Sequence, residues 1–171
     1  TVLELLIVLA AVAVVVLLSV PGSNMLLEKH RISSASSQLS GSLELALLEA
    51  HKRSSTGRVC PSSNGSTCRT DGNWNLGWLV YSDGNGIDSV EDIEIIRAYK
   101  APHQKITISA DGAVKSSASF TSAGLNMDQD ARAGSFRICL KGSDSTPTVV
   151  KVDAEGWVQR MSGQNGLCGQ G

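Results

Sequence analysis

The sequence predicts an α+β protein in which one long N-terminal helix packs on a small antiparallel β-sheet head. Three observations lead to this fold class. The chain opens with an apolar run, continues with apolar residues at helical spacing, and changes near residue 56 to short β-type runs separated by Gly, Asn, Asp and Ser. Its 171 residues leave room for this helix and one head of single-domain size.

The first predicted element, residues 1–21, is an apolar helix. Residues 5–18 are all apolar, and Val2, Leu3 and Val20 extend the run to roughly the 20 residues that cross a bilayer core. The first four residues contain no Lys or Arg, whereas a secretory signal has a positive N-terminal region. We therefore expect a single-pass membrane helix whose N-terminus has already been processed.

Glu4 is the one charged residue of this apolar run. A carboxylate in hydrocarbon costs a few kcal/mol unless it is neutralised or paired. Within one straight helix we do not expect Glu4 to reach its own amine. The predicted partner is the N-terminal amine of a neighbouring helix shifted along its axis, so that the pair sets the register between subunits. Solvation of Glu4 at the lipid interface is the alternative.

The second predicted element, residues 22–55, is an amphipathic helix. Pro21 and Gly22 are expected to interrupt the helix where the chain leaves the membrane, because proline removes a backbone donor. The helix then resumes and runs to about Arg53. Its apolar residues recur at three- and four-residue steps and predict one stripe packed on the head: Ile32, Ala35, Leu39, Leu43, Ala46, Leu47 and Ala50.

The third predicted section, residues 56–171, is the β-rich head. The expected strands are 77–82, 93–99, 105–109, 135–140, 148–152 and 156–161. Asp111-Gly112 and Glu155-Gly156 resemble hairpin turns between alternating segments, so the sheet is predicted to be largely antiparallel.

All four cysteines lie in the head, and an even number behind a membrane segment predicts disulfides formed in an oxidising compartment. Three pairings are possible. The turn-rich loop between Cys60 and Cys68 can close easily, which favours Cys60–Cys68 and leaves Cys139 for Cys168. A zinc site is the alternative, but there is no Cys-x-x-Cys and the three histidines are scattered. We expect no cofactor.

The formal net charge of −1 gives no global field for nucleic acid or anionic lipid. Residues 71–97 hold six carboxylates against the single Arg97, a net charge of −5, and predict an acidic face; the carboxylates are Asp71, Asp83, Asp88, Glu91, Asp92 and Glu94. Asp83, Asn85 and Asp88 alternate like calcium ligands, although their spacing departs from an EF-hand. A solvated acidic turn is the preferred interpretation.

Neither an enzyme nor a strong nucleic-acid binder is predicted. There is no Gly-x-Ser-x-Gly elbow, and no histidine lies in a motif that identifies a general base. From residue 134 onward the sequence contains four Lys or Arg and three Asp or Glu residues, a net charge of only +1, whereas nucleic-acid binding favours a basic cluster. Arg137, Lys141, Lys151 and Arg160 are the candidates for a small DNA-contacting edge.

The segment Thr1-Val-Leu-Glu4-Leu-Leu-Ile-Val-Leu-Ala10, followed by Pro21, resembles the mature N-terminus of type IV pilins and type II secretion pseudopilins. In that family the glutamate is the fifth mature residue, so Glu4 matches if one residue, normally a methylated phenylalanine, is absent from this chain. Further stretches resemble the FimT/GspH family of minor pilins and pseudopilins: residues 46–50, 60–63, 77–83, 95–97 and 154–156.

The resemblance implies a pilin fold, maturation by prepilin peptidase with cleavage and methylation, and no catalysis by the subunit. It implies a single pass through the inner membrane with the head in the periplasm. An inner-membrane assembly platform would then add the subunit to other minor and major pilins in a helical filament at the cell surface. Glu4 and Pro21 are the expected assembly residues.

The resemblance favours a minor pilin that primes or caps a type IV pilus, a filament used in adhesion, twitching motility and DNA uptake. The Cys-Pro-Ser loop and the cysteines resemble pilus subunits more than secretion homologues. A GspH-type pseudopilin of type II secretion is one alternative. A DNA receptor in natural transformation is another. Such receptors have a C-terminal Gly-Arg-x-Arg sequence; the matching stretch in this chain is Gly156-Trp157-Val158-Gln159-Arg160, which lacks the first arginine.

Overall fold

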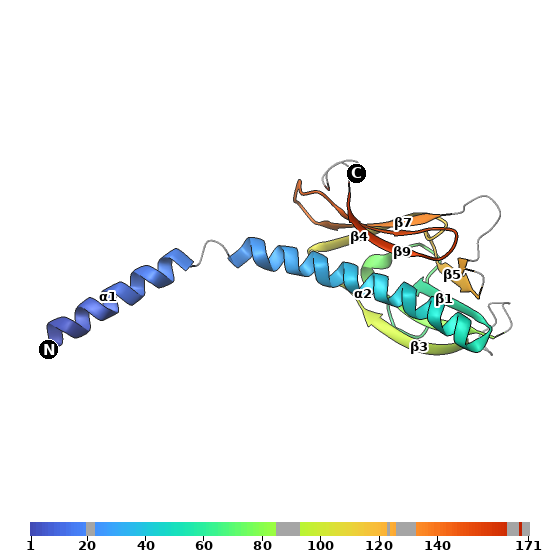
Figure 1. The fold of residues 1–171 in the computed structure, drawn as a ribbon, viewed down its shortest axis with the longest axis horizontal. Helices are drawn as coiled ribbons and strands as arrows, with labels where there is room; N and C mark the ends of the chain where they lie inside the picture. Colours follow the sequence, from blue (N-terminus) through green and yellow to red (C-terminus); the bar gives the residue numbers. More distant parts are fainter. Residues whose placement is uncertain (20–22, 85–92, 123, 126–132, 164–167, 169–171) are drawn as a thin grey trace. The chain divides into compact units, whose positions relative to one another are not determined.

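The computed structural model describes residues 1–19, 23–84, 93–122, 124–125, 133–163 and 168 (Figure 1). The chain divides into two compact units, residues 1–31 and 32–171, and each is described by itself. Helix α1 spans Val2–Ser19 and helix α2 spans Ser23–Arg53. The predicted interruption at Pro21 lies outside the described residues.

From Ile32 onward α2 belongs to the second unit, where one face of the helix is part of the core. The predicted stripe is buried at Ala35, Leu39, Leu43, Ala46 and Ala50, while Ile32 and Leu47 are partly buried against the same core. Figure 1 shows this part of α2 lying across strands of both sheets. The helical spacing therefore predicted the packed face correctly.

The head contains two antiparallel sheets. The five-stranded sheet has the order β3-β2-β1-β5-β6, with β1 at Thr56–Pro61, β2 at Gly77–Asp83, β3 at Ile93–Lys100, β5 at Ala118–Thr121 and β6 at Gly124–Leu125. The four-stranded sheet has the order β4-β7-β8-β9, with β4 at Ile106–Gly112, β7 at Gly134–Leu140, β8 at Thr148–Val152 and β9 at Val158–Ser162. A short 3-10 helix, η1, covers Trp74–Leu76.

The core lies between α2 and the inner faces of the two sheets. Trp74 packs edge-on against Phe136 of β7, with ring centroids 4.8 Å apart, and its indole N–H donates to the Lys115 carbonyl at 3.0 Å. The helix approaches β1 so closely at Gly57 that a Cβ there would lie 2.0 Å from the carbonyl oxygen of Ala46. Only glycine fits at this crossing without moving the backbone.

The structure confirms the α+β fold class and contains strands at all six predicted places. The turn at Glu155-Gly156 is also confirmed, because β8 and β9 pair across it. The prediction of a hairpin turn at Asp111-Gly112 is wrong, because both residues lie in β4, opposite Ser135 and Gly134 of β7. Strand β4 pairs with a strand distant in sequence, which local turn chemistry does not reveal. Strands β1, β5 and β6 were not predicted.

Candidate subunit-assembly site

Helix α1 has apolar surface on every side. All side chains from Val2 to Val15 are exposed, with exposed fractions of 79% at Val2 and 63% at Val15. A helix that is apolar all round is normally covered by other apolar groups. Among the described residues, no helix combines the length and the hydropathy needed to cross a membrane. The membrane span predicted for residues 1–21 is therefore not confirmed.

Glu4 lies in the first turn of α1, and the structure corrects one expectation about it. Its Oε2 is 3.4 Å from the amino group of Thr1, so the carboxylate does reach the amine of its own chain. Residues three apart lie on the same side of a helix, which brings the two groups together. Both are largely exposed, and a solvated ion pair of this kind contributes little to stability. Pairing with a neighbouring subunit remains a prediction.

Both disulfides are present with the pairing that the sequence predicts. Cys60–Cys68 has a Cα–Cα distance of 5.6 Å, and Cys139–Cys168 one of 5.5 Å. Within the first loop the Asn64 side chain accepts hydrogen bonds from the backbone N–H groups of Ser66 and Thr67, both at 3.0 Å. The amide therefore shapes the turn that lets the two cysteines meet.

The predicted acidic face is not found in the described part of residues 71–97. Asp83 is fully buried, with its Oδ2 3.4 Å from Arg58 Nη2, and Asp71 accepts a hydrogen bond from Arg69 Nε at 3.1 Å. This guanidinium lowers the pKa of the Asp71 carboxyl. Each carboxylate is neutralised by an arginine that precedes the acidic segment in sequence. The remaining carboxylates apart from Glu94 lie outside the described residues: Asp88, Glu91 and Asp92.

The calcium candidate loses support for the same reason. Asp83 is committed to Arg58, while Asn85 and Asp88 lie outside the described residues. In the part of the chain that the structure describes, no three His, Cys, Asp or Glu side chains are placed to hold a metal ion.

The four DNA candidates lie on the four-stranded sheet or at its end, but not on one face. Alternation along the strands separates them: Val149 pairs with Arg137, whereas Val150, a core residue, pairs with Arg160. Arg137 and Lys151 consequently face outward. Arg160 faces α2, where its Nη1 donates to Ser37 Oγ at 2.5 Å. The fourth candidate, Lys141, follows the end of β7.

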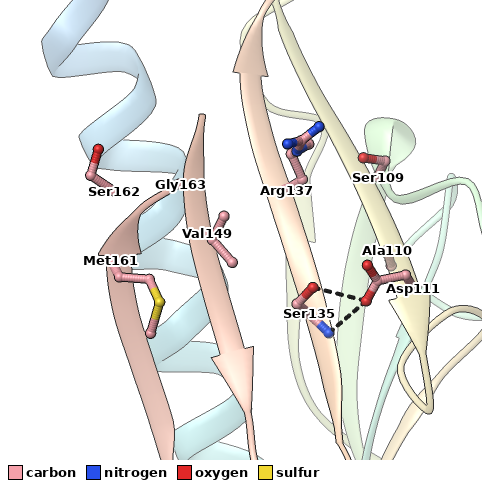
Figure 2. A pocket seen from close by; sticks show the side chains of 9 residues that line it. All are labelled: Ser109, Ala110, Asp111, Ser135, Arg137, Val149, Met161, Ser162 and Gly163. Atoms are coloured by element: carbon pink, nitrogen blue, oxygen red, sulfur yellow. Dashed lines mark hydrogen bonds between the residues drawn. The ribbon is translucent and has the colours of Figure 1, made fainter. Parts of the chain in front are cut away.

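Arg137 lines a groove of about 660 Å³ on the outer face of this sheet (Figure 2). Asp111 faces the same groove, and its Oδ1 accepts hydrogen bonds from the Ser135 backbone N–H at 3.0 Å and from Ser135 Oγ at 2.8 Å. Met161 of β9 supplies an apolar wall. The groove therefore combines one cation with one anion and is not the cationic surface that DNA binding requires.

Comparison with known proteins gives the family. The family described as "Type II transport protein GspH" matches residues 35–156. The chain belongs to the GspH family. The matched region contains the core-forming half of α2 and the strands from β1 to β8, and it confirms the resemblance found in the sequence. It does not include α1, so the family match gives no support to the role expected of Glu4.

Two crystal forms of the type IV minor pilin FimU from Pseudomonas aeruginosa have the same fold as this GspH-family chain. Both are 17% identical in sequence. One has a TM-score of 0.61 and covers 82% of this chain and 96% of its own, and the other has a TM-score of 0.57 and covers 80% and 97%. The pilin fold is thereby confirmed. A comparison with curated protein sequences gives no significant match.

The second unit of this GspH-family chain also contains a charged cluster that the sequence did not predict; it consists of Arg53, Glu49 and Glu94 and is called the Arg53 clamp below. Arg53, at the end of α2, donates from Nε to Glu49 at 2.7 Å and from Nη2 to Glu94 of β3 at 3.1 Å. Hydrogen bonding to Arg53 lowers the pKa of both carboxyls, and the two carboxylates raise the pKa of Arg53. The i,i+4 spacing of Glu49 and Arg53 was a signal for the first contact. Nothing local indicated Glu94.

Proposed function

We propose that this GspH-family chain is a minor pilin, a structural subunit that enters a type IV pilus through its N-terminal helix. The observation that carries the proposal is the surface of α1, which is apolar and exposed all round from Val2 to Val15. Such a surface is stable when helices of neighbouring subunits cover it. The fold shared with a type IV minor pilin supports the same role.

In this proposal the three sections of the chain have separate tasks. Residues 1–21 anchor the subunit in the inner membrane and later pack in the filament core, with Glu4 accepting the amine of a neighbouring subunit. Residues 22–55 join this segment to the head. Residues 56–171 form the head in the periplasm and then on the pilus, where an oxidising environment suits its two disulfides.

The assembly machinery belongs to the same proposal. Prepilin peptidase would mature the N-terminus, and the inner-membrane platform would insert the subunit beside other minor and major pilins. Priming or capping of the filament is the role that we propose for the assembled subunit.

A second candidate is a pseudopilin of type II secretion, which the description of the matching family favours. Deletion of the gene separates the two roles. The pilus role predicts loss of surface pili and twitching with protein export intact, and the subunit should be present in pili sheared from wild-type cells. Loss of export with normal piliation would replace the pilus role by the secretion role.

The DNA-receptor alternative has less support. Arg160 is engaged with Ser37 on the side facing α2, whereas Arg137 and Lys151 face the other way. The candidate cations therefore do not form one surface for a phosphate backbone.

A further inference from the structure

The outer edge of β3 has no pairing strand among the residues that the structure describes. Strand β3 is eight residues long and pairs with β2 on one side, and no other strand within the described part of the chain pairs with its second side (Figure 1). The edge strand β4 differs, because the Asn75 side chain accepts the N–H of Ile108 at 2.7 Å and so covers part of that edge. An open edge offers backbone donors and acceptors to an added strand.

The charged side chains of β3 differ in whether they form ion pairs with other described residues. Glu94 is held by Arg53 through two hydrogen bonds. Arg97 and Lys100 are exposed, and neither forms an ion pair with a residue that the structure describes. Among the described residues, the strand therefore presents two cations without an ion-pair partner and one carboxylate that is already neutralised. This balance favours an acidic partner.

A cavity with a mixed lining, which includes Arg58 and Arg69 as well as apolar side chains, reaches the same strand at Ile95. Its volume is about 670 Å³, and its floor includes Leu79 and Tyr81 of β2 together with Ile95 of β3, which is 41% exposed. A strand added beside β3 would lie about 4.8 Å away and place alternate side chains on this face. The side chain opposite Ile95 would then lie at the mouth of the cavity, where an apolar residue fits best.

A second copy of β3 does not suit this edge. The antiparallel register that places Glu94 opposite Lys100 of another copy also places the two Arg97 side chains opposite each other. An in-register parallel pairing does the same. Like charges directly opposite one another destabilise a sheet, so the edge discriminates against its own sequence.

We propose that the edge of β3 binds an extended acidic segment of another protein by strand addition, with an apolar side chain opposite Ile95. Acidic side chains of this segment lie beside Arg97 and Lys100. The site belongs to the head alone and does not depend on how α1 enters a filament, so it can fail while the proposed pilin role stands, and the reverse.

Three ten-residue peptides test the proposal on the purified full chain. One alternates valine and glutamate, the second alternates valine and lysine, and the third is the valine–glutamate peptide with alternate backbone nitrogens methylated. We expect the first to bind at least about tenfold more tightly than either of the others. The lysine peptide replaces a charge attraction at the edge by a repulsion, and the methylated peptide loses edge hydrogen bonds. Hydrogen exchange should slow in β3 when this peptide binds.

Two double variants locate the effect. Arg97→Glu with Lys100→Glu should reverse the preference between the glutamate and lysine peptides, whereas Lys141→Glu with Lys151→Glu, matched in charge change, should leave it unaltered. The wild-type peptide series keeps the test decisive if a variant fails to fold. Equal binding of all three peptides, protection in β9 instead of β3, or a dimer of the chain joined through β3 would overturn the proposal.

Discussion

Two glycines of the second unit, residues 32–171, show how much one side chain can matter. Gly57 lies on β1 against the backbone of Ala46, whereas Gly41 lies on the exposed side of α2, where a Cβ would have no neighbouring atom within 4 Å. Neither position has a positive φ. The difference between them is therefore steric at Gly57 and a matter of helix propensity at Gly41.

Gly57→Ala should destabilise the head by about 1–3 kcal/mol, because the helix and β1 must separate to accommodate the methyl group. Gly41→Ala, the matched control, should stabilise it by roughly 0.5–1 kcal/mol, because alanine is the better helix former. Urea unfolding followed by tryptophan fluorescence measures both. A neutral result at Gly57 would contradict the close helix–strand crossing.

At the scale of elements, the Arg53 clamp and the two disulfides connect parts that are distant in sequence. Arg53 joins the end of α2 to β3, and Cys139–Cys168 joins β7 to the C-terminal segment. These links tie the end of α2 to β3 and Cys168 to β7. Each link should have a measurable signature of its own.

The clamp predicts a particular pH dependence of stability. Arg53 lowers the pKa of Glu49 and Glu94 below their ordinary value of 4.5, so their contribution is present at neutral pH and is lost as the pH falls through the lowered folded-state values. Arg53→Met should therefore flatten the loss of stability on acidification below about pH 5. Lys151→Met serves as the control, and urea midpoints across this range give the comparison. Parallel curves for wild type and Arg53→Met would show that the clamp has no such role.

The two disulfides should differ in their contribution. They close loops with sequence separations of 8 and 29 residues. Loop-closure entropy predicts that removal costs about 2.5 kcal/mol for Cys60–Cys68 and about 3.5 kcal/mol for Cys139–Cys168. Paired Cys→Ala variants, unfolded in urea, test this order. A larger loss at the shorter loop would contradict the loop-closure account.

The sequence predicted the packed face of α2 and six of the strands, because periodicity is a local property. The helical steps that placed Leu39 and Leu43 on the packed face of α2 can be read directly from neighbouring residues. Pairing between distant segments cannot. The strand status of Asp111, the burial of Asp83 beside Arg58 and the contact of Arg53 with Glu94 all depend on partners that are far away in sequence or were expected to be solvated.

At the scale of the whole molecule, the chain combines a head that has its own core with a helix that lacks cover. The core residues of the head are buried by their neighbours in α2 and the two sheets, whereas α1 exposes its apolar side chains throughout Val2–Val15. A large exposed apolar surface marks an interaction site, and in a polymer the helices of neighbouring subunits would cover it. The proposed pilin role follows from this contrast more than from any feature of the head.

Glu4 gives the most direct test of this central claim. Wild-type, Glu4→Ala and Glu44→Ala subunits should be compared by immunoblotting of sheared filaments, with Glu44 as a control because it is an exposed glutamate on α2. The account predicts that Glu4→Ala lowers the amount in filaments by at least about tenfold, because a carboxylate pair in apolar surroundings contributes a few kcal/mol. Glu44→Ala should leave it unaltered. Glu4→Ala subunits present at the wild-type level would contradict the account.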